Sequence, residues 1–104
     1  MRSGLQNEVL ALYRRALRMV RTKPPPARPK FLLFVRHTFR INAAKVSPRN
    51  VGAIEHLLRK GGRQLTMYED EAVRDCWVSE DMIAWDRSRR EAASGSRTLN
   101  KTII

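Results

Sequence analysis

The chain has 104 residues, a mass of 12.0 kDa and one cysteine, which excludes a multi-domain enzyme and any internal disulfide. It carries 21 lysine and arginine residues against 10 acidic residues, while 42% of its residues are hydrophobic, so it is a globular and strongly cationic protein. Residues 1–65 hold 15 basic and 2 acidic side chains. This excess of positive charge favours binding to an anionic partner such as nucleic acid, an anionic membrane surface or an acidic protein.

The first predicted element is an amphipathic helix over residues 5–21, with Ser3 as its expected N-cap. Its apolar residues recur at steps of three and four and form one stripe: Leu5, Val9, Leu12, Ala16 and Val20. A basic row runs beside that stripe at helical spacing: Arg14, Arg18 and Arg21. Residues 1–30 contain a single acidic residue, Glu8, so this basic and partly amphipathic segment also has the composition that the mitochondrial import machinery recognises.

Residues 22–29 contain four prolines and are predicted to be a stiff, extended connector, because proline lacks an amide donor and disfavours helix in its predecessor. The next predicted helix covers residues 30–44. Its core-forming side chains occupy about half of its circumference: Phe31, Phe34, Val35, Thr38, Phe39 and Ile41. A face this wide suggests contact with two neighbours, and it leaves Arg36 and Arg40 on the opposite half. The longest apolar run, residues 31–35, is far too short to cross a bilayer, so no membrane span is expected.

A third helix is predicted to begin at Ser47 and Pro48, which have the character of an N-cap and a first-turn proline. Its apolar stripe consists of Val51, Ile54, Leu57, Leu58, Leu65 and Tyr68. This stripe is continuous only if the helix runs through Gly61 and Gly62. Each glycine costs about 1 kcal/mol relative to alanine, so the doublet either ends the helix or permits a close backbone approach. Gly61 lies on the stripe, which favours close approach at that position.

Residues 69–92 are expected to form an acidic, tryptophan-containing extension. Residues 72–77 are compatible with a short helix, and Ser79 resembles the cap of a further helix. We expect Trp77 and Trp85 to complete the core of the bundle rather than to cover one end of it.

The predicted fold is all-α, because three amphipathic helices joined by short connectors bury their stripes most simply in an antiparallel bundle. We assign residues 1–68 to a small three-helix bundle and residues 69–92 to a partly helical extension. Residues 93–104 have the composition of a flexible, disordered tail.

The residues do not support a catalytic centre, a metal site or an intrinsic cofactor. Cys76, His37 and His56 are the obvious nucleophile and imidazole candidates, and their spacing matches no known site geometry. A zinc site needs about four convergent ligands, which one cysteine and two histidines on separate helices do not supply. We therefore expect a protein that is not an enzyme.

The arginine rows of the first two helices suit binding to an acidic helix of a partner protein, because a guanidinium group can hold a carboxylate or a phosphate with two hydrogen bonds. A merely solvated face would mix charges of both signs, whereas acids are nearly absent here. The alternative from a different class is a basic nucleic-acid-binding module, for which the positive charge is adequate. The aromatic residues of this segment belong mainly to the predicted core stripes: Tyr13, Phe31, Phe34 and Phe39. Because they are not interleaved with the arginines as stacking platforms, no nucleic acid is expected.

Two motifs resemble the mitochondrial LYR-motif family: Leu12-Tyr13-Arg14 in the first helix, and an arginine three residues before a phenylalanine, Arg36 and Phe39, in the second. Within that family, the run Ile-Glu-His-Leu-Leu-Arg-Lys-Gly-Gly-Arg-Gln-Leu over residues 54–65 is similar to members that assist succinate dehydrogenase assembly. Lys23-Pro24 after the first helix also fits those members.

The resemblance implies a three-helix bundle of the mitochondrial matrix that binds the mitochondrial acyl carrier protein, whose acyl-phosphopantetheine enters the bundle. The residues that it assigns to the carrier and the acyl chain are Leu12, Tyr13, Arg14, Arg18, Val35, Arg36, Phe39 and Arg40. It also implies an assembly chaperone of succinate dehydrogenase (complex II) that binds the enzyme's iron-sulfur subunit during cluster insertion. The residues that it assigns to that subunit are Arg59, Lys60 and Arg63. A cluster-transfer co-chaperone would be a further partner, and the alternative is another LYR adaptor serving a different respiratory complex or the cysteine desulfurase.

Overall fold

A computed structural model describes residues 4–103 of the chain, with the side chains of residues 4–93. Helices account for all of the regular structure in this part of the chain: α1 (Gly4–Arg21), the 3-10 turn η1 (Pro25–Ala27), α2 (Arg28–Lys45), α3 (Val51–Tyr68) and α4 (Glu80–Ile103). The predicted all-α fold is therefore confirmed, whereas the expected N-cap, Ser3, lies outside the described residues.

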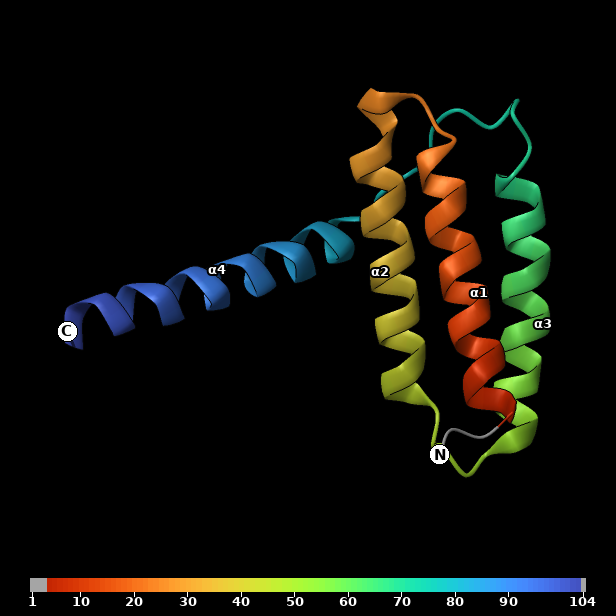
Figure 1. The fold of residues 1–104 in the computed structure, drawn as a ribbon, viewed down its shortest axis with the longest axis horizontal. Helices are drawn as coiled ribbons and strands as arrows, with labels where there is room; N and C mark the ends of the chain where they lie inside the picture. Colours follow the sequence, from red (N-terminus) through yellow and green to blue (C-terminus); the bar gives the residue numbers. More distant parts are fainter. Residues whose placement is uncertain (1–3, 104) are drawn as a thin grey trace.

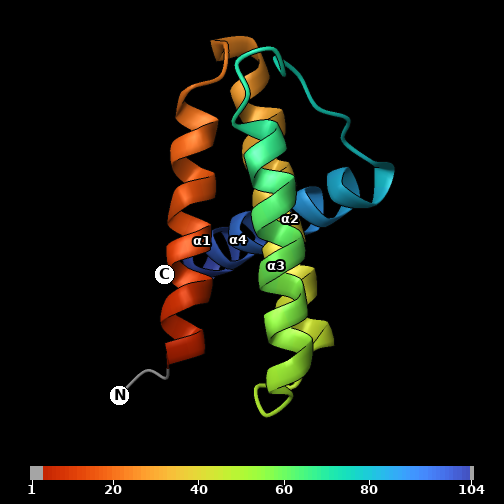
Figure 2. The same ribbon diagram turned by 90° about the vertical axis from the view of Figure 1, so that its right-hand side faces the viewer.

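The first three helices form an antiparallel bundle. In Figure 1, α1 lies between α2 and α3, and the chain runs up α1, down α2 and up α3. Helix α1 packs against both of its neighbours, while α2 also contacts α4. Figure 2 shows α3 in front of α2 with α1 to one side, and buried side chains of all three helices belong to one core cluster. The wide face predicted for α2 accordingly meets more than one neighbour.

The core is formed by side chains from all three helices and from η1: Ala16, Met19, Val20, Ala27, Phe31, Val35 and Leu65. Phe31 is completely buried, and its ring centroid lies 6.2 Å from that of Tyr68 on α3. Phe34 approaches the same tyrosine at 5.3 Å in an edge-on arrangement. Edge-on aromatic pairs of this kind add to the stabilisation gained from burial, so they fasten α2 to α3 at the end where α3 stops.

The connector between α1 and α2 is a tight turn, and the prediction of an extended segment over residues 22–29 was wrong. The amide of Ala27 donates to the carbonyl of Pro24 at 2.9 Å, which closes η1, and α2 begins at Arg28. Pro29 therefore lies in the first turn of α2. The missing amide of proline is harmless there, because the first amides of a helix have no intrahelical partner in any case.

Helix α3 begins three residues later than Ser47 and Pro48 indicate, and its N-cap is Asn50. The Asn50 side chain accepts a hydrogen bond from the amide of Ala53 at 3.1 Å. Ser47 instead closes the preceding turn, since its carbonyl accepts from the amide of Asn50 at 2.9 Å. The chain needs this turn to reverse direction before α3 can pack against α1, so tertiary geometry selects the later of two suitable caps.

Helix α3 continues through its two glycines, as the apolar stripe predicts. A Cβ atom on Gly61 would lie 3.0 Å from Cδ2 of Leu12 on α1, whereas nothing lies within 4 Å of the corresponding position at Gly62. The close approach expected at Gly61 is therefore confirmed. It also shows that Leu12 faces α3.

Residues 69–79 cross the top of the bundle and lead to α4 on the far side of α2 (Figures 1 and 2). The ammonium group of Lys23, a side chain only 3% exposed, donates to the carbonyls of Asp70 at 3.1 Å and Val73 at 2.5 Å. The side chain of Asp70 accepts from the amide of Ala72 at 2.9 Å. These bonds hold a turn where a short helix over residues 72–77 was expected, and the segment is not helical.

Helix α4 begins after Ser79, whose hydroxyl accepts from the amide of Met82 at 3.2 Å, so the expected cap is confirmed. The helix leaves the bundle beside α2 (Figure 1) and continues to Ile103, through much of the segment predicted to be a tail. The flexibility of that segment stays a prediction. Trp77 is 79% exposed and Trp85 packs on the outer side of α2, so neither completes the core as expected. The reason is that the linker carries both tryptophans past the end of the core.

Candidate functional site

A groove of about 460 Å³ opens where α1, α2 and α4 meet. We call it the α1–α2–α4 groove. Its lining residues come from all three helices: Val9, Leu10, Tyr13, Arg36, Phe39, Arg40, Ala43, Trp85 and Arg89. Apolar side chains and arginines are thus combined in one open hollow, a composition that suits a molecule with both an alkyl part and an anionic part.

An aromatic pair joins α1 to α2 in this groove. The ring centroids of Tyr13 and Phe39 lie 5.0 Å apart at an angle of 72°, and both side chains are half-buried. Each ring therefore packs against the bundle on one side and remains accessible on the other. The two rings thus pack between α1 and α2, and they combine a contact between helices with an exposed edge.

Two arginines on α2 supply the positive charge of the groove. Arg36 and Arg40 are four residues apart, so they project from the same side of the helix, and both are exposed. Neither side chain forms an ion pair or a hydrogen bond with another described residue. Their guanidinium groups are therefore free to hold a carboxylate or phosphate of a partner.

Helix α4 contributes Trp85 and Arg89 to the groove. The Trp85 ring meets the ring of His37 at 5.6 Å, and the guanidinium carbon of Arg89 lies 5.4 Å from the Trp85 centroid. Arg89 is also paired with Asp86 at 3.0 Å, an acid that pairs with Arg90 as well. The charge of Arg89 is therefore partly neutralised, in contrast to the charges of Arg36 and Arg40.

The structure brings together four of the residues that the family resemblance assigns to the carrier and its acyl chain: Tyr13, Arg36, Phe39 and Arg40. The other four lie outside the groove lining. Leu12 faces α3, and Val35 is 4% exposed within the core. Arg14 and Arg18 are exposed on α1, and the positive charge of Arg18 acts on Glu69 at the α3 end. What each of these residues binds stays a prediction.

Five groove residues were not singled out for this role from the sequence: Val9, Leu10, Ala43, Trp85 and Arg89. Val9 belongs to the α1 stripe and so was assigned to the core. Trp85 and Arg89 are four residues apart on a capped helix, which places them on one face. No periodicity, however, indicates which element that face meets.

The basic cluster of α3 is separate from the groove. Arg59, Lys60 and Arg63 are exposed, and none of them is paired with another described residue. His56 is exposed one helical turn before Lys60. The cluster is a second unpaired cationic surface, and its location on α3 keeps it out of the groove that α1, α2 and α4 line.

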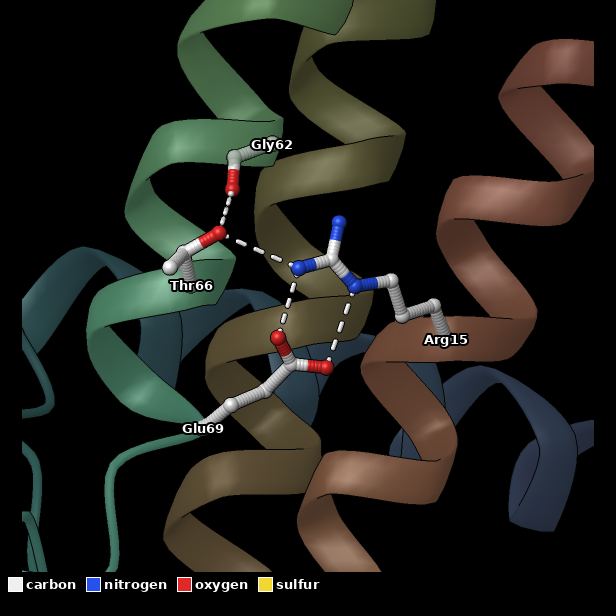
Figure 3. Close-up of polar contacts among 4 residues, drawn as sticks. All are labelled: Arg15, Gly62, Thr66 and Glu69. Carbon is white, nitrogen blue, oxygen red and sulfur yellow. Dashed lines mark hydrogen bonds and ion pairs between the residues drawn. The ribbon is translucent and has the colours of Figure 1, made fainter.

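A hydrogen-bonded ion pair ties α1 to the end of α3 (Figure 3). The guanidinium group of Arg15 donates to both carboxylate oxygens of Glu69, at 2.6 and 3.0 Å, and to the hydroxyl of Thr66 at 3.1 Å. Thr66 in turn donates to the carbonyl of Gly62 at 2.9 Å. The hydrogen bonds from Arg15, helped by the charge of Arg18, hold the pKa of Glu69 below its ordinary value. Among the described residues, Arg15 thus has an ion-pair partner, whereas Arg14 and Arg18 have none.

No group of three or more potential metal ligands occurs among residues 4–103 as far as they are described. Burial raises the pKa of the Cys76 thiol, with the carboxylate of Asp75 adding to the effect, so the reactive thiolate is disfavoured. Within the same residues, no helix combines the length and apolar character that spanning a membrane requires.

Comparisons with known proteins give a consistent result. The complex 1 protein (LYR family) domain matches residues 7–67. The mitochondrial succinate dehydrogenase assembly factor 1 of Schizosaccharomyces pombe is 41% identical over 77 residues, which cover 74% of this chain and 96% of that protein. Assembly factor 1A of Dictyostelium discoideum is 40% identical over 70 residues, covering 65% and 76%, and assembly factor 1 of Saccharomyces cerevisiae is 35% identical over 66 residues, covering 64% and 82%. No solved structure was found to match the chain.

Proposed function

This chain belongs to the complex 1 protein (LYR) family, and from that premise we propose that it is a mitochondrial assembly factor for succinate dehydrogenase. The names of the relatives supply the client enzyme and the compartment. The α1–α2–α4 groove supplies a means of binding a partner. The observation that carries the mechanism is one juxtaposition: Arg36 and Arg40, both unpaired, border the Tyr13–Phe39 pair.

The first partner that we propose is the acylated mitochondrial acyl carrier protein. An acidic helix and a phosphopantetheine phosphate offer the anions that Arg36 and Arg40 can hold in charge-assisted hydrogen bonds. Arg14 and Arg18, exposed on α1, extend this positive field beyond the groove and would speed the encounter with an acidic surface. Binding of this kind weakens as salt is added.

The acyl chain would occupy the apolar part of the same groove. Each methylene that leaves water contributes about 0.8 kcal/mol, so a chain of about fourteen carbons offers on the order of 10 kcal/mol before the costs of ordering it. Tyr13 and Phe39 are half-buried and border the groove, and rearrangement of these two rings would open a path toward the buried Val35 and the core. A ligand bound there also stabilises the folded bundle, because it binds the folded state alone.

The second partner that we propose is the iron-sulfur subunit of succinate dehydrogenase, held by Arg59, Lys60 and Arg63 in the matrix while its clusters are inserted. These side chains carry unpaired positive charge on a face of α3 that does not line the groove. The two partners can therefore bind at the same time. A cluster-transfer co-chaperone would join the complex through the client.

Charge reversal tests the carrier site. The variant Arg36→Glu/Arg40→Glu should lose co-purification with the acyl carrier protein, because each substitution turns an attraction into a repulsion. Arg49→Glu/Arg87→Glu is the matched control, since it changes the net charge equally at exposed positions outside the groove. Carrier binding that survives in the groove variant, with circular dichroism showing an intact fold, would reject this site.

A second pair of substitutions tests the assembly role. In cells that depend on this protein, Arg59→Glu/Arg63→Glu should lower the amount of mature iron-sulfur subunit and the activity of succinate dehydrogenase while leaving carrier binding intact. The same Arg49→Glu/Arg87→Glu control should preserve both. Normal enzyme levels with the α3 variant would show that this face does not hold the client.

A further inference from the structure

We infer that α4 forms the third wall of the carrier-binding groove and that Trp85 contacts the alkyl part of the acyl-bearing arm. This inference rests on the proposed carrier function and adds a binding residue to it. In the structure, Tyr13 of α1, Phe39 of α2 and Trp85 of α4 line the same hollow of about 460 Å³. Trp85 is the aromatic side chain that α4 contributes to this lining, beside Arg89.

Two side chains contact the Trp85 ring and restrict its orientation. His37 meets its ring at 5.6 Å from α2, and Arg89 lies 5.4 Å from its centroid. The ring nevertheless remains half-buried and borders the groove, so part of its surface is available to a ligand. A tryptophan whose orientation is fixed offers a large apolar contact at little entropic cost.

The apolar lining identifies which part of the partner Trp85 meets. Val9, Leu10 and Ala43 share the groove with it and carry no charge, so this part of the hollow suits an alkyl chain. The unpaired charges of Arg36 and Arg40 border the same hollow and suit the phosphate or an acidic side chain. The charge of Arg89 is already paired with Asp86. We therefore assign α4 an apolar role and assign the binding of the anion to Arg36 and Arg40 of α2.

Helix α4 is an addition to the part of the chain that matches the family. That match ends at residue 67, before the linker begins. The relative from Schizosaccharomyces pombe is matched over 96% of its own length by 74% of this chain, which leaves about a quarter of the chain without a counterpart in it. The Trp85 wall therefore distinguishes this chain from a bare three-helix bundle.

The two tryptophans give a direct spectroscopic test, because Trp77→Phe leaves Trp85 as the sole tryptophan of the chain. This variant should be titrated with recombinant acyl carrier protein that carries a tetradecanoyl chain, and in parallel with carrier that bears phosphopantetheine alone. Trp85 emission should shift to shorter wavelength with the acylated carrier and much less with the unacylated one. Binding of the acylated carrier, measured by calorimetry, without any change in Trp85 emission would overturn the inference.

Affinity provides the second measurement. Trp85→Ala should weaken binding of the acylated carrier by about tenfold or more, since each methylene returned to water reduces affinity roughly fourfold. Trp85→Phe should recover most of that loss. Trp77→Ala is the matched control, because Trp77 is 79% exposed and does not line the groove, and it should bind within about twofold of the wild type.

The outcomes separate this inference from the proposed function. If the wild-type protein binds no carrier, the carrier function and the inference both fail. If Arg36→Glu/Arg40→Glu abolishes binding but Trp85→Ala leaves the affinity for acylated carrier unchanged, the carrier function stands and only the role of α4 is rejected. Circular dichroism of Trp85→Ala, together with its affinity for unacylated carrier, shows whether an observed loss reflects the acyl chain or a general loss of fold.

Discussion

Lys23→Met is expected to lower the free energy of unfolding by about 2–3 kcal/mol, a large fraction of the stability of a small domain. Lys23 is 3% exposed, and its ammonium group donates to two linker carbonyls and lies 5.3 Å from the centre of the Phe31 ring. Hydrogen bonds from a charged group contribute about 1.5–3 kcal/mol each, and the cation–π contact adds about 0.5–2 kcal/mol. The expected loss is smaller than their sum, because Met keeps the apolar stem and avoids the cost of burying a charge.

Lys30→Met is the matched control, because it removes the same charge from a lysine that holds the same linker. Lys30 pairs with Asp75 at 3.2 Å, but its side chain is 52% exposed, so the pair is screened by water. Urea unfolding followed by circular dichroism should give a clear shift for Lys23→Met and little change for Lys30→Met. Hydrogen exchange in residues 70–76 should accelerate in the first variant only. Equal losses in the two variants would refute the reasoning that burial decides the contribution of these lysines.

Two further predictions concern the contact between α1 and α3. Gly62→Ala should raise the free energy of unfolding by about 1 kcal/mol through helix propensity alone. Gly61→Ala should raise it clearly less, because the new methyl group would lie 3.0 Å from Leu12. Urea titrations that rank the two variants in the opposite order would contradict the close approach of α1 and α3 at Gly61. Glu69→Gln should cost at most about 1 kcal/mol at neutral pH, since its bonds to Arg15 are partly exposed. Arg15 lowers the pKa of Glu69 in the folded state. The stabilisation from this ion pair is therefore complete above the ordinary pKa of 4.5 and is lost as the pH falls through the lower pKa of the folded state. A stability difference between Glu69→Gln and the wild type that persists unchanged below that folded-state pKa would contradict this prediction.

The sequence was sufficient to predict the three-helix bundle because its helices bury continuous stripes. In α1 and α3, apolar residues recur with the helical period, and the stripe of α3 continues across Gly61. The wide face of α2 predicted two neighbours, which α1 and α3 provide: Phe39 meets Tyr13 of α1, and Phe31 and Phe34 meet Tyr68 of α3. These features depend on local periodicity, and local periodicity is what a single sequence records most directly.

The start of α3 could not be predicted in the same way, because two capping residues compete within four positions. Ser47 is followed by Pro48, which is the stronger local signal for a helix start. Asn50 is nevertheless the cap, since Ser47 is needed to close the turn that reverses the chain. The choice depends on the packing of α3 against α1, and tertiary geometry of this kind leaves no mark on local propensity.

The groove was only half predictable for a related reason. The spacing of Tyr13, Arg36, Phe39 and Arg40 placed them on helices expected to be neighbours, and the structure brings them together. Trp85 reaches the same hollow through a linker whose path depends on contacts distant in sequence. No pattern within residues 69–92 indicates that α4 meets the outer side of α2 rather than the core.

Because the position of α4 depends on the path of the linker, Lys23 should be energetically coupled to the groove, and this coupling can be measured. Lys23 fixes the linker at residues 70 and 73, and α4 begins shortly afterwards, at Glu80. If Lys23 influences the groove only by placing α4, then Lys23→Met should weaken binding of the acylated carrier in the wild-type background and have no further effect when Trp85 is already alanine. Calorimetric titration of the two single variants and the double variant gives the coupling directly. Additive losses of affinity would mean that Lys23 acts on the bundle as a whole, and that the linker does not transmit its effect to the third wall.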